Sequence, residues 1–571
     1  MARTHWCMAP PPPADELALM AGELGVPEPV ARILWNRNLR ACDPARRFLD
    51  PQLDDLEDAY QMADMGLAVE RLREAVGRGE PILVHGDYDV DGVTSTFLMT
   101  KALRLLGGEV SFFIPDRLRD GYGLSETGLE EAARRGASLI VTVDCGVTAA
   151  DPVARALARG MDVIITDHHE PLGPLPAARA VVNPKRPDCR YPFKELAGIG
   201  VTSKVVQALF ERMRPEAARG FLEEHLDVIA LGTIADVVPL VGENRVLAKL
   251  GMQRLESTRN AGLVALKETA GLKTRRVDSG HVAFILAPRI NAAGRLGKAD
   301  TGVRLLQAAT GDEARELAET LEEDNNLRRR IDEETLSEAE TLISREIDFA
   351  RDSVIVLWSD RWHSGVLGIV ASRLVERYCR PTILIALDGD EGRGSGRSLP
   401  GLNLWEALQQ VQDCLIAYGG HSHAAGLNIE RAHLEEFRHR LNGEVGRRLT
   451  EEDFCHRLDL DGEIRLDQCG LGLVEWLERL APWGLRNSEP LFLAHDVELS
   501  GWSSVVSRNH LKMVVRQDGH VAECIGFNLG YLAGELNRAP GKFSLAFTPI
   551  RNVWQGRERV QLKVRGVQPG A

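Results

Sequence analysis

Short apolar runs alternate with segments of helical periodicity over residues 81–183. Four runs are hydrophobic at consecutive rather than alternate positions: Pro81–His85, Val110–Ile114, Leu139–Val143 and Val163–Thr166. Segments with helical spacing, such as 95–106 and 125–135, separate these runs. Continuous apolar strands are typical of a parallel sheet that helices cover on both faces. The pattern therefore predicts a parallel-sheet α/β domain in the N-terminal half of the chain.

Residues 312–347 contain no glycine or proline, and apolar side chains recur there at helical spacing among many charges. At about 1.5 Å per residue, such a helix is about 50 Å long, which favours a connection between two domains. Two further apolar runs, 353–358 and 381–386, flank a predicted helix over 365–378. We interpret this region as a second, smaller α/β unit.

After about Phe492 the pattern changes to short strands separated by turn residues, for example 510–515, 543–547 and 559–564. Gln555 and Gly556 stand between two such strands as a hairpin signal, so a small β-barrel or sandwich is predicted. The expected division of the chain is an N-terminal segment, an α/β domain, the long helix, a smaller α/β domain and a β domain, at 1–50, 51–311, 312–347, 348–450 and 451–571.

Composition is that of a folded protein with more than one domain. The chain has 571 residues, of which 44% are hydrophobic and 27% charged. At roughly 150 residues per domain, this length predicts two to four domains, and the hydrophobic and charged fractions exclude disorder as the main state. The net charge of −14 argues against nucleic acid as a partner. Residues 501–571, however, carry ten basic and four acidic residues, so only a uniformly basic binder is excluded.

The sequence contains no membrane-spanning or secretory signal. No window of about 18 consecutive apolar residues occurs, and the N-terminus lacks a basic region followed by an apolar stretch. The nine cysteines are scattered and never form a Cys-x-x-Cys pair, so neither a disulfide framework nor a zinc ribbon is expected. We therefore expect a cytoplasmic protein with no membrane partner.

Carboxylates and histidines follow the predicted parallel strands where each strand ends. The first strand runs into 85–92, His-Gly-Asp-Tyr-Asp-Val-Asp-Gly, with three carboxylates at alternate positions. Asp144 follows the third run, Asp-His-His at 167–169 follows the fourth, and Asp236 follows a later helical segment. Because the carboxyl ends of parallel strands line the crevice where ligands bind, we expect these side chains to converge.

A single aspartate in such a place is more often a helix cap or a turn residue. The whole set is harder to explain in that way, because clustered carboxylates raise one another's pKa unless a multivalent cation is bound. Carboxylates with imidazole and without cysteine favour Mn²⁺ or Mg²⁺, and imidazole tilts the preference towards Mn²⁺. The number of ligands suffices for two ions, which suits in-line displacement at phosphorus.

Four segments resemble, in order and spacing, the motifs of the DHH phosphoesterase superfamily: 87–91, 143–146, 167–169 and 232–236. The resemblance implies that one ion is held by His85, Asp89 and Asp144. It implies that a second ion is held by Asp91, Asp144, His168 and Asp236, with Asp144 bridging the two. The resemblance makes Asp144 and His169 the catalytic residues, and His169 would contact the substrate phosphate or donate a proton. Asp87 and Asp167 would orient the metal ligands.

The superfamily includes pyrophosphatases, phosphodiesterases of short or cyclic oligonucleotides, and the RecJ family of single-strand DNA exonucleases. Segments 287–297, 393–398 and 418–426 resemble the nucleic-acid-cleaving members, RecJ in particular, which have a DHHA1 domain. The C-terminal β region resembles the oligonucleotide-binding barrel (OB-fold) of RecJ. The DNA- or phosphate-binding residues that the resemblance implies are Arg289, Asn291, Arg295, Arg393, Ser395, Arg397, Gly419, Gly420, His421 and Trp554.

Simpler interpretations stay open for several of these residues. The glycine cluster can be only a turn, and Arg289 and Arg295 can form surface ion pairs of little energetic value. Tyr122 is a candidate for base stacking or for plain packing. Aromatic residues of a small barrel are more often core than stacking platforms, which applies to Trp502, Phe527 and Trp554. The chain also departs from the family pattern, with Arg486 where glycine is usual, Ser488 where proline is usual and Gly566 where an acid is usual.

The resemblance implies an exonuclease that removes 5′-mononucleotides from the 5′ end of single-stranded DNA, in repair and recombination. Single-stranded DNA is then the partner, with single-strand-binding protein and repair helicases as further candidates. One rival is a phosphodiesterase of short oligonucleotides or cyclic dinucleotides, which would need neither the β domain nor the long helix. The other is a non-catalytic DNA-binding scaffold, which the complete acidic and histidine motifs disfavour.

Overall fold

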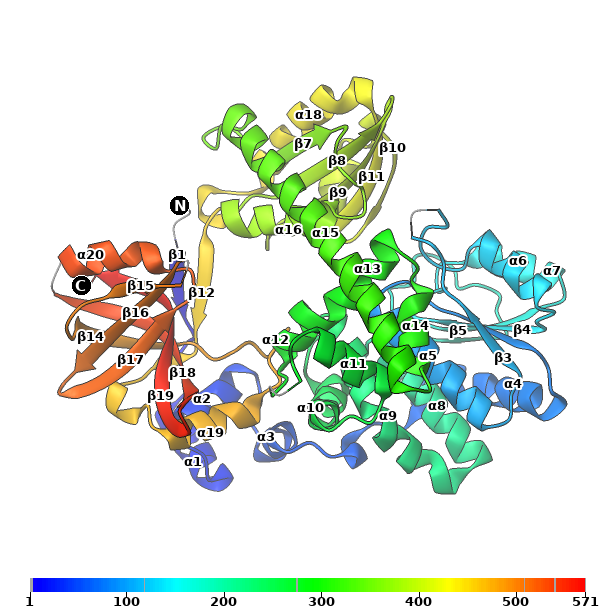
Figure 1. Cartoon of the computed structure of the whole chain (residues 1–571), viewed down its shortest axis with the longest axis horizontal. Coiled ribbons are helices and arrows are strands. Elements are labelled where there is room, and N and C mark those ends of the chain that lie inside the picture. Colours follow the sequence, from blue (N-terminus) through cyan, green and yellow to red (C-terminus); the bar gives the residue numbers. More distant parts are fainter. Residues whose placement is uncertain (1–3, 118, 274–275, 508, 539–540, 570–571) are drawn as a thin grey trace. The chain divides into compact units, whose positions relative to one another are not determined.

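The computed structural model describes residues 4–117, 119–273, 276–507, 509–538 and 541–569 (Figure 1). The chain divides into two compact units, which we describe separately. Unit 1 comprises Met1–His5, Asp116–Gly121 and Pro288–Leu458, and unit 2 comprises Trp6–Pro115, Tyr122–Ala287 and Asp459–Ala571.

A five-stranded parallel sheet is the framework of the first part of unit 2. Its order is β3-β2-β4-β5-β6, and its strands are β2 (Ile82–His85), β3 (Val110–Phe113), β4 (Leu139–Val143), β5 (Asp162–Thr166) and β6 (Ala180–Val182). Every residue of β2 and β4 is buried, which accounts for their continuous apolar runs. The predicted parallel α/β fold is confirmed.

Helices cover both faces of this sheet. Ile82 and Val84 share one core cluster with α4 (Met65–Arg78), α5 (Val90–Leu105), α8 (Gly198–Met213) and α9 (Pro215–Ala235). Leu83, between them on the strand, belongs to the opposite cluster with α6 (Glu126–Arg134) and α7 (Ala150–Ala158). The chain continues through α10 (Gly242–Glu256), α11 (Ala261–Thr269), α12 (Ser279–His281) and the π-helix η3 (Val282–Leu286).

Five strands of the C-terminal region pair in a closed ring, β14-β18-β19-β17-β16 and back to β14. They are β14 (Phe492–Leu499), β16 (His510–Gln517), β17 (His520–Gly526), β18 (Lys542–Trp554) and β19 (Arg557–Pro569), with the short β13 (Gly462–Glu463) and β15 (Ser504–Val506) added at the ends. Gln555 and Gly556 connect β18 and β19 with φ values of 52° and 75°, which confirms the predicted hairpin.

The N-terminal helices share the core of this β region although more than 400 residues separate them in sequence. They are α1 (Ala14–Leu24), α2 (Glu28–Asn36) and α3 (Cys42–Leu49), and their apolar residues pack with those of β16 and α19 (Leu471–Leu480). Arg486, which stands where the family usually has glycine, has a φ of 57°. That left-handed backbone is the physical reason why glycine suits this position.

Unit 1 is built on the long helix α15 (Gly311–Glu346, 36 residues), so the predicted helix over 312–347 is confirmed. A second sheet has the order β10-β11-β9-β8-β7, with strands β7 (Ile355–Ser359), β8 (Thr382–Asp388), β9 (Glu391–Arg397), β10 (Leu415–Gly420) and β11 (Ala424–Glu430). Helix α16 (Leu367–Tyr378) and the end of α15 pack on one face, and α17 (Leu404–Gln409) and α18 (Leu434–Arg448) on the other. Two shorter helices, α13 (Ala287–Leu296) and α14 (Asp300–Gln307), precede α15.

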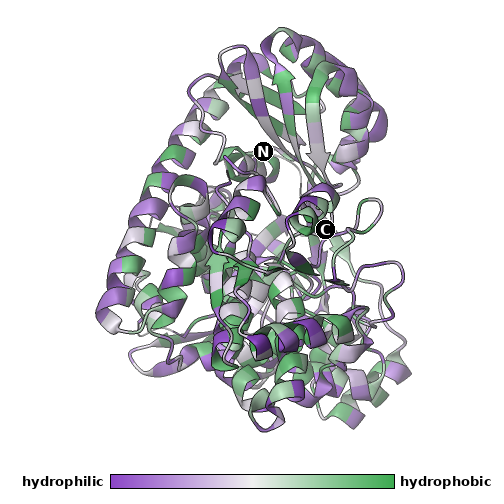
Figure 2. Cartoon of the chain, turned by 90° about the vertical axis from the view of Figure 1, so that its right-hand side faces the viewer, coloured by the Kyte–Doolittle hydropathy of each residue, from purple (hydrophilic) through white to green (hydrophobic). Residues whose placement is uncertain are grey.

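Figure 2 shows hydrophilic and hydrophobic residues interspersed along the helices, as expected where a helix buries only one face. Within the described ranges, no helix combines the length and the apolar character that a membrane crossing requires.

Candidate metal centre and phosphate-binding face

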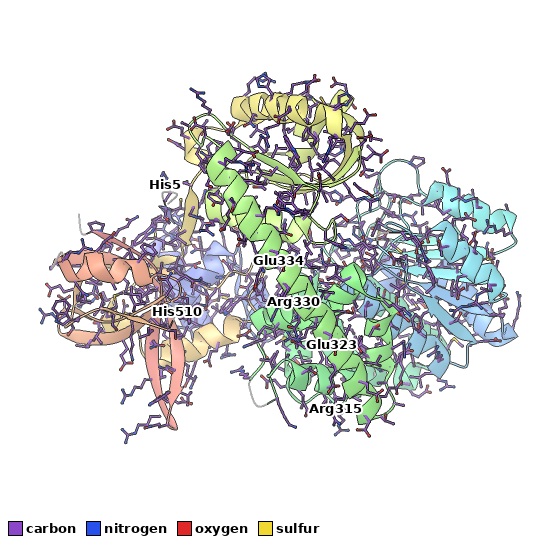
Figure 3. All side chains as sticks on the ribbon, turned by 45° about the horizontal axis from the view of Figure 1, so that its top comes forward. His5, Arg315, Glu323, Arg330, Glu334 and His510 are labelled. Atoms are coloured by element: carbon purple, nitrogen blue, oxygen red, sulfur yellow. The ribbon has the colours of Figure 1, made fainter. Side chains whose placement is uncertain are left out.

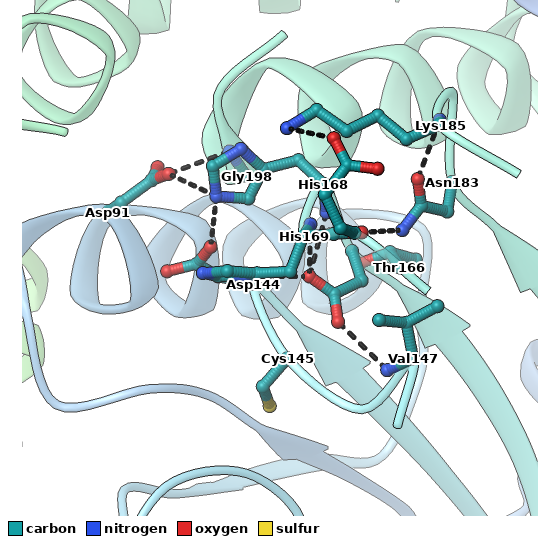
Figure 4. A network of polar contacts seen from close by, with 12 residues as sticks. Asp91, Asp144, Cys145, Val147, Thr166, His168, His169, Asn183, Lys185 and Gly198 are labelled. Carbon is teal, nitrogen blue, oxygen red and sulfur yellow. Dashed lines mark hydrogen bonds and ion pairs between the residues drawn. The ribbon is translucent and has the colours of Figure 1, made fainter. Parts of the chain in front are cut away.

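Acidic and imidazole groups converge at the carboxyl ends of the unit 2 strands (Figure 4). His168 Nε2 lies 3.2 Å from Asp144 Oδ1, 3.6 Å from Asp236 Oδ2 and 3.9 Å from Asp91 Oδ2. His168 Nδ1 lies 3.0 Å from the Leu196 carbonyl oxygen, so Nδ1 carries the hydrogen and Nε2 presents its lone pair. Four acceptor atoms therefore face one another, an arrangement that a cation between them would stabilise.

Three of these four atoms lack other hydrogen-bond partners in the described part of the chain. Asp144 Oδ1, Asp236 Oδ2 and His168 Nε2 are buried, and none has a hydrogen-bond partner among the described residues. Unpaired buried acceptors are costly unless a ligand satisfies them. The four residues predicted for one ion, Asp91, Asp144, His168 and Asp236, thus fit a divalent cation.

A second group of potential ligand atoms lies beside the first. It consists of one carboxylate oxygen from each of Asp87, Asp89 and Asp144, and these three oxygens lie within 4.8 Å of one another. Asp144, His168 and His169 form a further group of the same kind. Asp87, expected to orient ligands, is therefore itself placed among them. His85, expected to bind the same ion as Asp89, is fully buried at the end of β2, with Nδ1 3.9 Å from Cys145 Sγ.

The N-terminus of α8 holds Asp91 in position. The Gly198 N–H donates to Asp91 Oδ2 at 2.6 Å, and the Ile199 N–H donates to Oδ1 at 2.7 Å. A carboxylate is favoured at a helix N-terminus, where N–H groups and the helix dipole both stabilise negative charge. Gly198 also approaches Asp144, because a Cβ at this position would lie 2.3 Å from Asp144 Oδ1. Sequence reasoning missed Gly198, although the glycine-rich helix start Gly198-Ile-Gly200 was a signal that could have identified it.

Replacement of Gly198 by Ala should therefore displace Asp144 and Asp91 together. A misplacement of about 1 Å at a reacting centre lowers turnover by about 10²-fold, and we expect a loss of this size while the fold is retained. The measurement is Mn²⁺-dependent hydrolysis of an oligonucleotide, with circular dichroism to check folding. Gly220→Ala in α9 is the matched control, since a Cβ there meets nothing within 4 Å. Full activity of the Gly198 variant would contradict this role.

Asp167 orients the two histidines of the 167–169 segment. Its Oδ1 accepts from the backbone N–H groups of His168 and His169, at 2.7 and 3.1 Å, and lies 2.8 Å from His169 Nδ1. Its Oδ2 accepts from the Val147 N–H at 2.9 Å. Both oxygens thus contact the backbone of this segment or the His169 ring, an arrangement that suits an orienting residue.

Tyr122 also lies at this site. Its hydroxyl donates to the Asp144 carbonyl oxygen at 3.2 Å and lies 2.9 Å from His169 Nδ1. The tyrosine and His169 rings make an edge-on contact with centroids 5.4 Å apart. The ring remains 47% exposed, so the packing alternative does not account for Tyr122 completely.

The electrostatics of the site favour a bound cation. Burial, followed by repulsion from Asp91, raises the pKa of Asp144 well above its usual range, and the same two causes raise the pKa of Asp236. Burial and then Asp89 raise the pKa of Asp91 to about 7. Burial lowers the pKa of His168 to about 3, so this ring is neutral and able to bind a metal. Asp144 also has a φ of 62°, a strained conformation of the kind found at functional sites.

His169 differs from His168 in its protonation. Burial is the largest influence on the pKa of His169 and lowers it, but the hydrogen bond with Asp167 and the negative charges of the nearby aspartates together raise this pKa above its ordinary value. Burial is also the largest influence on the pKa of Asp167 and raises it, but the hydrogen bond with His169, the charges of His169 and His168 and the Val147 N–H together lower the pKa of that carboxyl. A protonated His169 is suited to contact a phosphate oxygen or to donate a proton.

In unit 1, the predicted phosphate-binding residues of β9 lie on one face of the sheet. Arg393, Ser395 and Arg397 alternate with buried glycines along the strand. Strand register places Ser395 opposite Gly426 of β11, and Gly426 opposite Gly419 of β10. Because residues opposite one another share a face, small residues form a row here beside two arginines. Such a row lets the backbone of a ligand approach the sheet closely.

Arg295 and Arg397 both lie at the start of α16. Arg295 Nη1 donates to the Gly365 carbonyl oxygen at 2.8 Å, and a Cβ on Gly368 would lie 2.6 Å from Arg397 Nη2. Arg397 also donates to Ser395 Oγ at 3.2 Å. A helix N-terminus with two guanidinium groups and a hydroxyl has the chemistry of a phosphate site.

The guanidinium groups in this region repel one another. Burial, followed by repulsion from Arg117 and Arg328, lowers the pKa of Arg295 to about 10. Burial and then Arg117 also lower the pKa of Arg397. A bound anion would relieve this repulsion, so the electrostatics agree with the donor geometry.

The remaining predicted residues of unit 1 differ in their surroundings. Arg289 forms a buried ion pair with Glu322. This arrangement favours the ion-pair interpretation of Arg289 over a direct DNA contact, but the pair is buried and not at the surface. Asn291 is half-buried in α13. Gly420 has a φ of 139°, and the following His421 N–H closes the turn onto the Ala424 carbonyl at 2.8 Å. Gly420 is thus required by the turn, and His421 stands exposed at its tip.

Three aromatic residues of the β region are exposed, so of the two alternatives left open for them, stacking platform or core residue, the core alternative does not hold. Their exposed fractions are 78% for Trp502, 51% for Phe527 and 72% for Trp554. Trp554 lies at the end of β18, opposite Arg557 across the hairpin turn. The tip of this hairpin lies beyond the residues of β18 and β19 that pair with β14 and β17, and Val553 is exposed there as well.

Sequence models of three domain families match the chain. They are the DHH family N-terminal domain over residues 81–233, the DHHA1 domain over 351–447 and the RecJ OB domain over 460–566. The Bacillus subtilis single-stranded-DNA-specific exonuclease RecJ is 37% identical over 559 residues, which cover 97% of this chain and 70% of that protein.

Solved structures give the same result. The crystal structure of RecJ from Thermus thermophilus in complex with Mn²⁺ superposes with a TM-score of 0.85 at 31% identity and covers 100% of this chain and 80% of that one. The Mg²⁺ complex of the same protein superposes with a TM-score of 0.80 at 30% identity, covering 100% and 79% of the two chains. With its fold and all three domain families in common with these proteins, the chain belongs to the RecJ family of DHH phosphoesterases.

Proposed function

We propose that this protein is a metal-dependent exonuclease that hydrolyses single-stranded DNA from its 5′ end to 5′-mononucleotides, in DNA repair and recombination. The observation that carries the proposal is the arrangement of His168 Nε2 against carboxylate oxygens of Asp91, Asp144 and Asp236. The relatives that match nearly the whole chain are named single-stranded-DNA-specific exonucleases, which supports DNA as the substrate.

The cofactor in this proposal is a pair of Mn²⁺ or Mg²⁺ ions, the ions present in the two Thermus thermophilus structures. One ion would be held by Asp91, Asp144, His168 and Asp236. The other would be held by Asp89 and Asp144, together with His85 as the resemblance implies or with Asp87 as the distances favour. When bound, such ions activate water and stabilise the attacking and leaving oxygens of a phosphodiester.

The protein's own groups complete the site. His169, whose pKa is raised by its hydrogen bond with Asp167 and by the nearby aspartates, would contact a phosphate oxygen or supply the proton that the leaving oxygen needs. Tyr122 would hold the His169 ring in place through its hydroxyl. Asp144 would be shared by both ions, which makes it the catalytic residue with the largest expected effect.

DNA binding is assigned to the donors of unit 1 and to the β region. Arg295, Ser395 and Arg397 would bind a phosphate at the start of α16, and the row that contains Gly419 would lie against the sugar-phosphate backbone. The further contacts would come from Asn291, Arg393, Gly420 and His421, and Arg289 would contribute only by exchanging its ion pair with Glu322 for a phosphate. These contacts read the backbone and not the bases, so they would give no sequence preference.

Trp554 offers a direct test of the β region. Stacking of one base on an aromatic side chain contributes about 1–3 kcal/mol, so Trp554→Ala should weaken binding of a long single strand by roughly 5- to 150-fold. Hydrolysis of a dinucleotide should be unaffected. Fluorescence anisotropy with a labelled oligonucleotide measures the first effect. Unchanged affinity would remove Trp554 from the DNA-binding residues.

The protein partners, the location in the cell and the domain limits remain predictions. Single-strand-binding protein and repair helicases are candidate partners, and the location is expected to be cytoplasmic. The proposed domain limits are 51–311 for DHH, 348–450 for DHHA1 and 451–571 for the OB-fold, after an N-terminal segment of 1–50 and around the helix of 312–347. Each matched family segment falls inside the corresponding limits, which supports them.

The experiment that tests the proposed function compares substrates. The protein is incubated with Mn²⁺ and equal amounts of a single strand, a blunt duplex and a dinucleotide, and mononucleotide release is measured over time. We expect rapid release from the single strand only. Faster turnover of the dinucleotide would instead favour a short-oligonucleotide phosphodiesterase, and no turnover of any substrate would favour a binding scaffold.

A further inference from the structure

A row of buried polar side chains runs along one face of α15. Asn325, Arg328 and Asp332 follow one another at spacings of three and four residues, so they lie on one face of the helix. Their exposed fractions are 0%, 7% and 0%. Elsewhere on this helix the charged side chains Arg315 and Glu323 extend from its surface (Figure 3).

Hydrogen bonds connect the members of this row. Arg328 Nη1 donates to Asp332 Oδ2 at 2.6 Å, and Arg328 Nη2 donates to Asn325 Oδ1 at 2.7 Å. Arg373 of α16 approaches the same Asp332 oxygen at 3.9 Å. Asp332 therefore receives guanidinium groups from two helices.

The charges of the row also act on Arg295, one of the two arginines at the start of α16. Asp332 acts on both Arg295 and Arg328, where its negative charge opposes the lowering of their pKa by burial. Arg397 and Arg117 act on Arg295 in the opposite sense. Asp332 thus supplies negative charge to a cluster in which several cations repel one another.

The row is not a closed structural network. Arg328 Nε, Asp332 Oδ1 and Asn325 Nδ2 are buried, and none of the three has a hydrogen-bond partner among the residues that the structure describes. A buried network that serves only stability is normally satisfied throughout. Two of these atoms, Arg328 Nε and Asn325 Nδ2, are spare donors, and their place beside guanidinium groups that repel one another is consistent with a site that binds an anion.

We propose that Asn325, Arg328 and Asp332 are positioning residues for strand binding, in which Asp332 is the counter-charge that keeps Arg295 and Arg328 in place before a phosphate arrives. This inference rests on the proposed function, because it takes the phosphate contact by Arg295 and Arg397 from there. Asn325 fixes one side of the Arg328 guanidinium, and Asp332 fixes the other. The row would act through the arginines and would not touch the reacting atoms.

Asp332→Asn tests this role because it removes the charge and preserves the shape. The substitution weakens the charged hydrogen bond between Arg328 and Asp332. We expect about a tenfold rise of KM for a single strand, with kcat within about twofold of the wild-type value. Millimolar inorganic phosphate should raise the melting temperature of the wild-type protein, and less that of the variant. Asp312→Asn is the matched control, since Asp312 lies in the first turn of the same helix with its side chain 92% exposed.

Two outcomes would overturn the proposal. One is an Asp332→Asn variant that folds and has an unchanged or lower KM. The other is a variant that melts at a lower temperature but keeps the wild-type response to phosphate, as expected of a merely structural ion pair. The phosphate response needs no turnover, so it tests the row even if the protein does not hydrolyse DNA.

If Asp332→Asn does not fold, the Asn325→Leu variant tests the positioning role instead. It leaves every charge in place and removes one of the two hydrogen bonds that hold Arg328. We expect about a threefold rise of KM and a weaker stabilisation by phosphate, in line with the loss of one hydrogen bond. Wild-type values for both quantities in this variant would contradict the positioning role.

Discussion

Asp144→Asn should abolish DNA hydrolysis and leave the fold intact. The variant removes the charge of the carboxylate that belongs to two of the potential ligand groups. Asparagine is the cleanest replacement because Asp144 has a φ of 62°, a left-handed conformation that asparagine tolerates better than alanine. Loss of one preorganised charge interaction in an active site lowers kcat by about 10²- to 10³-fold, and a shared metal ligand should reach at least the upper end of that range.

The measurement is single-turnover hydrolysis of a labelled single strand, together with the rise in melting temperature caused by Mn²⁺. Both should fall in Asp144→Asn. The matched control is Asp151→Asn, since Asp151 is an exposed residue in the first turn of α7. Turnover of the Asp144 variant within tenfold of the wild-type rate would be incompatible with its assignment as a bridging ligand.

The second large effect is a change in stability with pH that depends on the metal. In the metal-free protein, burial raises the pKa of Asp91 from 3.8 to about 7 and raises the pKa values of Asp144 and Asp236 as well. At pH values between these two pKa values of Asp91, the folded protein holds protons that the unfolded chain has released. Its free energy of unfolding should therefore fall as the pH rises from about 4 through 7.

Bound Mn²⁺ should oppose this fall, because metal binding requires the deprotonated carboxylates. The stabilisation by Mn²⁺ should thus be larger at pH 8 than at pH 6. Urea unfolding at both pH values, with Mn²⁺ and with a chelator, measures the difference. Equal stabilisation at the two pH values would mean that these carboxylates do not exchange protons for metal.

The fold and the acidic site could be predicted from the sequence because both follow local rules. Continuous apolar runs identify buried parallel strands, and the ends of such strands meet at one edge. Asp144, Asp167 and His168 come directly after these runs, so their convergence was predictable without coordinates. The hairpin at Gln555 and Gly556 was predictable for a similar reason, since its backbone needs residues that accept positive φ.

Features that depend on distant parts of the chain were not predictable in this way. Gly198 matters because α8 approaches Asp144, 54 positions earlier in the sequence, and no local pattern contains that distance. Asp87 lies with Asp89 and Asp144 through the path of the loop after β2, which alternation in the sequence does not specify.

Arg289 and Arg295 show the same limit within a single helix. Both were expected to bind the nucleotide chain, and they are six residues apart in α13. Arg289 faces Glu322 of α15, whereas Arg295 reaches a carbonyl oxygen near the start of α16. Their residue type is identical, so only the tertiary neighbours separate an ion pair from a phosphate-binding candidate.

The most direct test of the proposed activity follows the two ends of one strand. A single-stranded oligonucleotide labelled at its 5′ end, and the same oligonucleotide labelled at its 3′ end, are each incubated with the protein and Mn²⁺. We predict that label appears in mononucleotide at once from the 5′-labelled strand and only late from the 3′-labelled strand, and that Asp144→Asn releases neither. Early release from the 3′ end, internal cleavage, or release that persists in the chelated protein would contradict a metal-dependent 5′ exonuclease.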